Sequence, residues 1–207
     1  MPDNISPLSD RMYSALNLAF ELHGGDSRKS SNVPMIAHMF SVCALVLQDG
    51  GEEDEGIAAL LHDALEDKPE KINRKDIENR FGKKVLEIVE VSTDTPKDYK
   101  GGPKPPWRIR KEAYLEHIRQ TDPGLLRVTV ADKIDNARAI LADYYQMGSK
   151  VWEKFNAPQE DQIWYYNAAV EAYQSVGFSG FLMDELCALV EQMNRLPNAN
   201  LKSVKRQ

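Results

Sequence analysis

Cysteine is scarce in this chain, since Cys43 and Cys187 are the only 2 among 207 residues. So few cysteines exclude a disulfide framework, and Cys43 lies in an apolar run where a free thiol acts as a small hydrophobic side chain. A chain of this length can bury a substantial core without disulfides. The cysteine content favours a reducing compartment, and we therefore expect a cytoplasmic protein.

Long apolar runs are missing as well. The N-terminal segment has no basic stretch followed by an apolar one, so no export signal is expected. No uninterrupted apolar run approaches the roughly 20 residues that a membrane-spanning helix requires. We therefore expect no membrane partner, and the formal net charge of −6 disfavours nonspecific binding to nucleic acid.

The sequence also has no alternating strand pattern, internal repeat, glycine-rich phosphate loop or paired-cysteine motif. Apolar residues instead recur at helical spacing, between signals that start and stop helices. Ser9 and Asn73 stand where N-caps are expected, and the glycine pair at 50–51 stands where a helix should end. The pattern predicts an all-α protein.

The first chemical anomaly ends an apolar helix that is predicted over residues 52–67. Its last turns carry four polar side chains, those of His62, Asp63, Glu66 and Asp67. At about 3.6 residues per turn, side chains four positions apart share a face, so this helix would present an imidazole and three carboxylates in one patch. Carboxylates this close repel one another unless a cation, protons or basic partners compensate them. A divalent metal would supply that cation.

The second anomaly lies in an apolar helix predicted over residues 124–145. Asp132 and Asn136 share one face of this helix, one turn apart. A buried aspartate requires a partner, so either an ion pair with a nearby base or a metal would explain it. The candidate bases on the same helix are Arg127, Lys133 and Arg138.

Two further segments carry candidate binding residues. A turn-rich stretch before the second helix holds Arg28 and Lys29, adjacent cations that could bind an anion. The helix after it, predicted over residues 35–48, has His38 in its first turn. Its core side is expected to comprise Ile36, Phe40, Ala44 and Leu47.

The longest stretch without periodicity spans residues 92–106 and leads into a basic helix predicted at 107–120. The cations of this stretch and of the start of the helix are Lys97, Lys100, Lys104, Arg108, Arg110 and Lys111. Two explanations stay open for this segment, an exposed loop or a binding loop for phosphate. The aromatic stripes of the C-terminal helices are expected to be core packing, against the rest of the chain or against another subunit, and the sequence allows a homo-oligomer.

The order of the candidates, His38, then His62-Asp63, then Asp132, on three different predicted helices, resembles the HD superfamily of metal-dependent phosphohydrolases. The resemblance implies a compact multi-helix fold with a metal site in the helical core. Two imidazoles and two carboxylates suit Mn, Fe, Co or Zn better than Ca, and leave positions open for water and a phosphate oxygen.

Three further motifs narrow the resemblance to the Rel/Spo-type alarmone hydrolases: Arg28-Lys29-Ser30, Glu66-Asp67, and Ala131-Asp132-Lys133-x-x-Asn136-x-Arg138. The resemblance covers most of the predicted fold. It implies a free-standing hydrolase domain over residues 1–207, with a core at 9–145 and C-terminal helices at 149–196 packed on that core.

The resemblance also implies roles for individual residues. One divalent ion, Mn, would be held by His38, His62, Asp63 and Asp132. Glu66 and Asp67 would orient and deprotonate the attacking water, because a metal lowers the pKa of its water and a nearby carboxylate can accept the proton. The implied substrate-binding residues are Arg28, Lys29, Met35, Lys111, Lys133 and Asn136. Lys133 and the segment from Lys97 to Lys111 would neutralise the departing pyrophosphate.

The implied function is hydrolysis of the 3′-pyrophosphate of (p)ppGpp or of its adenine analogue (p)ppApp. Met35 departs from the family pattern, which has an aromatic residue at this place, so the choice of base stays open. One alternative is an HD phosphatase for another nucleotide, such as NADPH. Two others are a non-catalytic sensor that keeps the metal and a helical interaction domain without metal.

Overall fold

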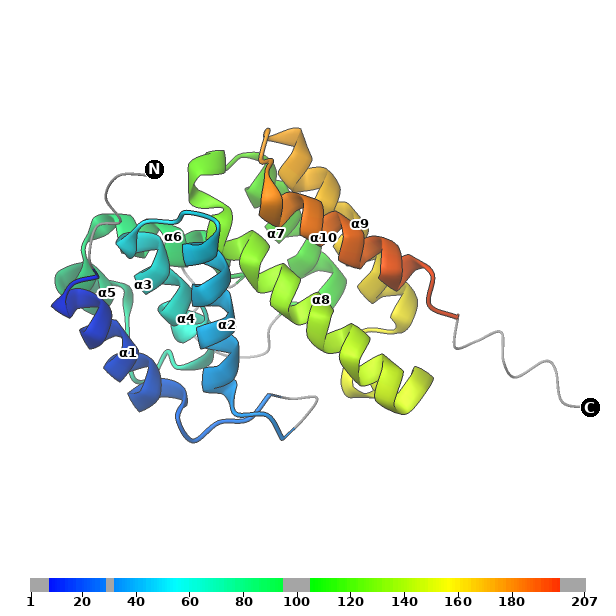
Figure 1. Ribbon diagram of the computed structural model, residues 1–207, viewed down its shortest axis with the longest axis horizontal. Helices are drawn as coiled ribbons and strands as arrows, with labels where there is room; N and C mark the ends of the chain where they lie inside the picture. Colours follow the sequence, from blue (N-terminus) through cyan, green and yellow to red (C-terminus); the bar gives the residue numbers. More distant parts are fainter. Residues whose placement is uncertain (1–7, 29–31, 95–104, 198–207) are drawn as a thin grey trace, which may run out of the picture.

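The computed structural model describes residues 8–28, 32–94 and 105–197, and over these residues the chain is all-α (Figure 1). The α-helices are α1 (Asp10–His23), α2 (Met35–Gln48), α3 (Glu53–Leu61), α4 (Ala64–Asp67), α5 (Arg74–Phe81), α6 (Lys83–Ser92), α7 (Trp107–Arg119), α8 (Arg127–Met147), α9 (Gln159–Ser175) and α10 (Phe181–Asn194). Two 3-10 helices, η1 (Pro123–Leu125) and η2 (Gly148–Lys154), flank α8. The all-α prediction is confirmed. Across the described ranges, no helix combines the length and the apolar character that crossing a membrane would take.

Helix boundaries follow the capping residues. The Ser9 side chain accepts a hydrogen bond from the backbone N–H of Arg11 and so caps α1. The Asn73 side chain accepts one from the backbone N–H of Asp76 and caps α5. Gly82 ends α5 and begins α6 at a φ of 93°, a backbone conformation that favours glycine. The sequence therefore sets these helix ends locally.

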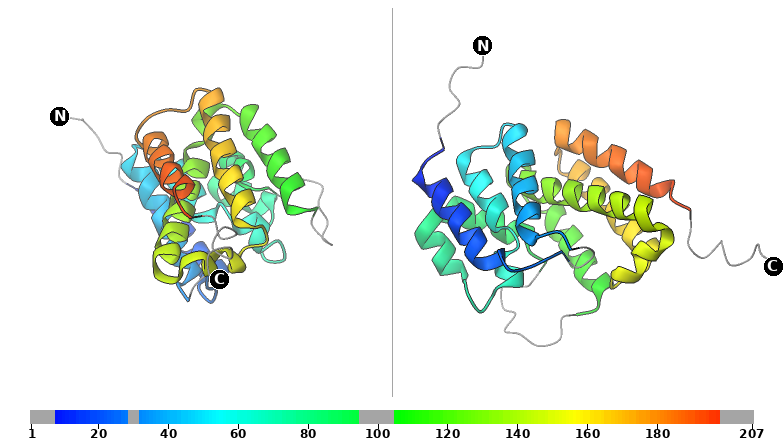
Figure 2. Two further views of the ribbon diagram at one scale, coloured as in Figure 1. Left: turned by 90° about the vertical axis from the view of Figure 1, so that its right-hand side faces the viewer. Right: turned by 60° about the horizontal axis from the view of Figure 1, so that its bottom comes forward.

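Helix α8 forms the centre of the arrangement. It packs against α2, α3 and α6 in one half of the molecule and against α10 and η2 in the other, as Figures 1 and 2 show. Helix α7 packs on α9, and α9 on α10. One continuous cluster of buried apolar side chains runs through both halves, from Met12 to Met193. The C-terminal helices therefore pack on the core of this same chain.

The helix expected over residues 52–67 is interrupted, so that prediction was wrong in this respect. Helix α3 ends at Leu61 and α4 begins at Ala64. The His62 ring nitrogen Nδ1 lies 2.8 Å from the carbonyl oxygen of Ala59. A side chain that takes a carbonyl from the last turn competes with the backbone N–H groups that would continue the helix. The interruption therefore falls at His62 and Asp63, two of the predicted metal ligands.

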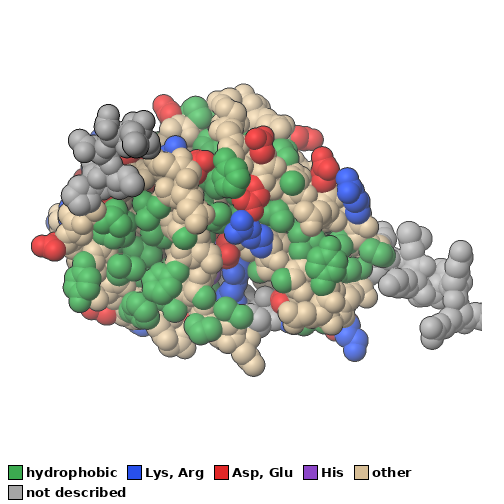
Figure 3. All heavy atoms as spheres, in the orientation of Figure 1, with side chains coloured by type: hydrophobic (Ala, Val, Ile, Leu, Met, Phe, Trp, Pro, Cys, Tyr) green, Lys and Arg blue, Asp and Glu red, His purple; other side chains and the backbone are tan. Residues whose placement is uncertain are grey.

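The face that α2 buries also differs from the prediction. Its buried residues are His38, Met39, Val42, Cys43, Leu45 and Val46. Phe40 is instead 39% exposed and packs edge to face on Phe20, with 5.6 Å between the ring centroids. Figure 3 shows hydrophobic side chains gathered over α1 and α2 on this side. Because α2 is apolar almost all round, periodicity could not select its inner face, and the packed structure turns His38 inward.

Candidate active site

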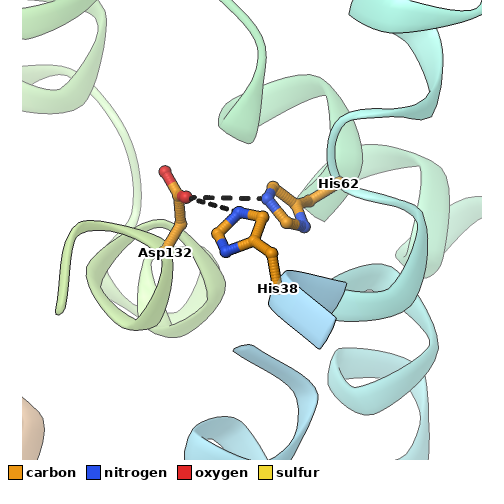
Figure 4. A group of neighbouring side chains, drawn as sticks. All are labelled: His38, His62 and Asp132. Atoms are coloured by element: carbon orange, nitrogen blue, oxygen red, sulfur yellow. Dashed lines mark ion pairs between the residues drawn. The ribbon is translucent and has the colours of Figure 1, made fainter. Parts of the chain in front are cut away.

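Three helices bring His38, His62 and Asp132 together in the interior (Figure 4). The side chains come from the first turn of α2, the end of α3 and the middle of α8, and they are 3%, 1% and 8% exposed. The Nε2 atoms of the two histidines lie 3.2 Å and 3.6 Å from Oδ1 of Asp132. One ligand atom from each residue lies within 4.8 Å of the others. Residues far apart in the sequence thus form one buried cluster.

Asp63 adds a second carboxylate beside the same two nitrogen atoms. Its Oδ2 lies 3.4 Å from Nε2 of His62 and 3.8 Å from Nε2 of His38. Its side chain is 27% exposed, so it approaches the histidines from the open side of the cluster. All four residues of the predicted ligand set therefore meet at one place.

The other ring nitrogen of each histidine is engaged away from the cluster. Nδ1 of His38 lies 2.7 Å from Oδ2 of Asp135, and Nδ1 of His62 contacts the Ala59 carbonyl. A carbonyl and an ionised carboxylate only accept hydrogen bonds, so each Nδ1 carries the hydrogen and donates it. In a neutral ring, Nε2 then keeps a lone pair, and Nε2 of His62 is a buried atom without a hydrogen-bond partner. Metal-binding histidines are held in this way, so the residues present fit a divalent metal ion.

The charges of the cluster are compensated by protons and by a lysine. Burial opposes the charged form of His38, but hydrogen bonds to Asp132 and Asp135 outweigh burial and raise the pKa of His38 to about 9. Burial likewise opposes charge on His62, yet the Asp63 carboxylate raises its pKa. Burial would raise the pKa of Asp132, whereas the Lys133 ammonium, 2.5 Å from Oδ2, holds this pKa well below its usual range. A divalent cation could replace the protons on the histidines.

The cluster lies at a cleft of about 740 Å³, a volume in the range of small-molecule sites. The predicted site residues that line this cleft are Arg28, Met35, His38, Asp63, Glu66, Asp67, Lys111, Asp132, Lys133 and Asn136. Lys29, Lys97, Lys100 and Lys104 fall outside the described residues. Glu66 is half-buried and Asp67 is exposed, both on α4 directly after the interruption at His62 and Asp63. The cleft therefore brings the candidate ligands, acids and cations together.

Arg28 and Asn136 join the cleft to the cluster. Arg28 donates from Nη1 to Oδ2 of Asp135 and from Nη2 to Oδ1 of Asn136, each at 2.6 Å. The Asn136 amide in turn donates to Oδ1 of Asp132 at 2.5 Å. Asn136 therefore orients Asp132, a contact that the sequence suggested only by placing both residues on one helix face.

The partner of Asp132 among the three candidate bases is Lys133. Arg127 instead pairs with Asp49 and Glu55, and Arg138 pairs with Glu185. The ion-pair explanation for Asp132 is therefore partly right, because a base does contact Oδ2. The Oδ1 atom nevertheless faces both imidazoles, so the lysine and the histidine cluster share one carboxylate.

Several residues of the cleft were not predicted from the sequence. In the sequence, Asp135 looks like an ordinary polar residue three positions after Asp132. Its contact with His38 arises only because α2 packs beside α8. Tyr165 and Tyr166 of α9 are 5% and 4% exposed and line the cleft. The ammonium of Lys111 lies 5.0 Å from the centre of the Tyr165 ring. The aromatic stripe of α9 is therefore core packing, as expected, and also part of a cleft wall.

Comparisons with known proteins agree with this geometry. The family model described as "HD domain" matches residues 15–162. The guanosine-3′,5′-bis(diphosphate) 3′-pyrophosphohydrolase MESH1 of Xenopus tropicalis is 32% identical over 155 residues, which are 68% of this chain and 82% of that protein. The guanosine-3′,5′-bis(diphosphate) 3′-pyrophosphohydrolase of Aquifex aeolicus (strain VF5) is 31% identical over 135 residues, 64% of this chain but 18% of that longer protein.

A solved structure described as a metazoan ortholog of SpoT that hydrolyzes ppGpp superposes with a TM-score of 0.71. The superposition covers 94% of this chain and 100% of that chain at 22% sequence identity. At this level of identity the likeness shows a common fold.

Proposed function

This chain belongs to the HD domain family, and we propose that it is a metal-dependent hydrolase that removes the 3′-pyrophosphate of (p)ppGpp or of its adenine analogue (p)ppApp. One observation carries the proposal: the buried cluster of His38, His62 and Asp132, with both Nε2 atoms directed at carboxylates, lies at a cleft of small-molecule size. The names of the relatives support the nucleotide class.

The metal would be held by His38, His62, Asp63 and Asp132, and we propose that it is Mn. Two imidazoles and two carboxylates form a mixed donor set that suits first-row transition ions. When bound, such an ion lowers the pKa of its water toward neutrality and polarises a phosphate oxygen.

Glu66 and Asp67 would act on the attacking water. Both line the cleft on α4, directly after the Asp63 ligand. A carboxylate within reach of the water orients it and accepts its proton as the oxygen bonds to phosphorus. The bond between that phosphorus and the ribose 3′-oxygen breaks, pyrophosphate departs, and the 3′-oxygen takes up a proton. The interruption of the helix at His62 and Asp63 separates the ligands from the acids.

The substrate-binding set that we propose is Arg28, Lys29, Met35, Lys111, Lys133 and Asn136. Arg28, Lys111 and Lys133 supply positive charge along the cleft, which compensates the charge on the phosphate oxygens. Met35 begins α2 and lines the cleft close to His38 in sequence, where its thioether offers a polarizable surface to a purine. A methionine lacks the hydroxyl of tyrosine, so it contacts either base without a polar preference.

The proposal is tested with the purified full chain, stripped of metal and then supplied with Mn. The panel comprises (p)ppGpp, (p)ppApp, NADPH and deoxynucleoside triphosphates, with products separated by anion-exchange chromatography. We expect release of pyrophosphate from an alarmone, and none from the chelator-treated sample. If the protein released orthophosphate from NADPH and did not turn over either alarmone, the alternative, an HD phosphatase for another nucleotide, would be favoured instead. If no phosphate ester were turned over, the enzyme proposal would fail and a sensor would remain.

A further inference from the structure

Asp135 lies beside the metal cluster but has no part in the reaction proposed above. Its side chain belongs to α8 and is buried. Its Oδ2 atom accepts two hydrogen bonds, from Nδ1 of His38 at 2.7 Å and from Nη1 of Arg28 at 2.6 Å. One oxygen atom thus connects a buried imidazole with a guanidinium that lines the cleft.

Helix α8 contacts both nitrogen atoms of the His38 ring. Asp132 meets Nε2 at 3.2 Å, and Asp135 meets Nδ1 at 2.7 Å. Residues three positions apart are neighbours on a helix surface, so one rigid element presents both carboxylates to the ring. The plane and the direction of the imidazole are therefore set by two side chains of the same helix.

We propose that Asp135 is a positioning residue that keeps the His38 ring turned with Nε2 toward the metal position and ties this ring to Arg28 in the cleft. A neutral imidazole has two tautomers, and the acceptor at one nitrogen decides which nitrogen is left to bind a metal. His62 has the same arrangement with a backbone carbonyl, which no side-chain substitution removes. His38 depends on a side chain, and its orientation can therefore be tested by mutation.

The test compares Asp135→Ala, which removes the acceptor, with Asp135→Asn, which keeps an acceptor oxygen but loses the charge. Mn affinity is measured by calorimetric titration of the metal-free full chain. We expect Asp135→Ala to weaken Mn binding by about 10-fold to 100-fold, the usual effect of losing such a partner, and Asp135→Asn to recover part of that loss. Wild-type affinity in a folded Asp135→Ala protein would overturn the proposal.

Asp49→Ala is the matched control. Asp49 accepts from Nε of Arg127 at 2.9 Å, so like Asp135 it pairs with an arginine, and its side chain is 17% exposed. We expect Asp49→Ala to lower the melting temperature while Mn affinity stays within about twofold of wild type, because Arg127 keeps its ion pair with Glu55 of α3. An equal loss of Mn affinity in both variants would mean that general loosening, rather than the orientation of His38, sets the affinity, and the proposal would fall.

A spectroscopic test covers the case in which Asp135→Ala does not fold. In wild-type protein loaded with diamagnetic Zn, the Nδ1–H of His38 should give a protected, downfield proton resonance, assigned by its absence in His38→Gln. Arg28→Met should retain this resonance, since Asp135 still accepts from the ring. A rapidly exchanging Nδ1–H in wild type would overturn the proposal.

The inference shares one premise with the proposed function, namely that a divalent metal ion binds at this site. Calorimetry and the ring resonance require no substrate, so they remain informative if the chain hydrolyses a different ester or none.

Discussion

Among single residues, the acidic side chains of the cleft have two different proposed roles, metal binding for Asp63 and water activation for Glu66 and Asp67. Asp63 lies within 4 Å of both Nε2 atoms, whereas Glu66 and Asp67 follow it on α4. We expect Asp63→Ala to lose Mn and activity together. Glu66→Ala and Asp67→Ala should retain Mn but lower kcat by about 10²-fold to 10⁴-fold, the typical contribution of a proton acceptor. Calorimetry and steady-state kinetics measure the two effects, and a normal kcat in Asp67→Ala would refute the water-activating role.

The proton held by His38 gives the metal-free protein a predictable pH dependence. The pKa of His38 is about 9 in the folded protein and 6.5 in its unperturbed state. Between these pH values the folded state binds more protons than the unfolded chain, so the free energy of unfolding falls as pH rises. We expect a loss on the order of 3 kcal/mol from this residue across the window.

Urea unfolding of chelator-treated protein at a series of pH values measures this loss. Saturating Mn serves as the control, because a bound cation takes the place of the proton and should flatten or reverse the trend. Stability of the metal-free protein that rises between pH 6.5 and 9 would contradict the expectation for His38.

Residue identity and order were enough to single out the candidate ligands. The order of His38, His62-Asp63 and Asp132 on three predicted helices resembles the HD pattern, so these residues were recognisable from the sequence. Asp135 was not, because its importance comes from the crossing of α2 over α8, which brings it to within 2.7 Å of His38. A role that depends on a contact between distant residues leaves no mark in the local pattern.

Among the helices, α8 is joined to α2 and α3 by Arg127. Its guanidinium contacts Asp49 at the end of α2 and Glu55 in the first turn of α3. These carboxylates are 17% and 11% exposed, so removing their common partner leaves two poorly solvated charges. We expect Arg127→Met to cost about 2 to 3 kcal/mol of unfolding free energy and to weaken Mn binding, because α8 carries Asp132 and α2 carries His38.

Arg138→Met is the comparison for that prediction. Arg138 joins α8 to Glu185 of α10, but its side chain is 47% exposed. An exposed ion pair contributes less than about 1 kcal/mol, so this variant should be close to wild type in urea unfolding and in Mn affinity. Equal losses of unfolding free energy and Mn affinity in the two variants would show that Arg127 does not stabilise the helix packing more than an exposed arginine does.

The sequence predicted where helices begin and end better than which sides they bury. The bounds of α2 agree with the prediction at both ends because Pro34 and the glycines after Asp49 act locally. Its predicted inner face was wrong at Phe40 and Ala44, which are exposed, whereas Ile36 and Leu47 do pack against the core. Apolar residues surround the helix, and contact with α3 and α8 selects the side that is buried. The interruption after Leu61 was missed because it depends on a hydrogen bond of the His62 ring, which helix propensity does not include.

For the whole molecule, the all-α class followed from apolar periodicity, but the place of the C-terminal helices did not. An aromatic stripe is buried equally well against its own chain or another subunit. In the structure, α10 packs on α8 and α9 packs on α7, and Tyr165 and Tyr166 form part of the cleft wall. The family match ends at residue 162, within α9, yet the buried cluster continues to Met193. The core therefore extends beyond the matched segment.

This continuity predicts that the chain unfolds as one unit. Helix α10 contributes Leu182, Leu186 and Val190 to the cluster, and without it the outer side of α8 would lose its apolar cover. A chain that ends at residue 158 should therefore lack a cooperative thermal transition and bind Mn poorly. The full chain should show one transition, with equal calorimetric and van't Hoff enthalpies. A chain ending at residue 197 keeps every described core residue and should match the full chain. If a chain ending at residue 158 unfolded cooperatively and bound Mn, α9 and α10 would be a separate folding unit. Metal binding would then not require the tyrosines that α9 places in the cleft wall.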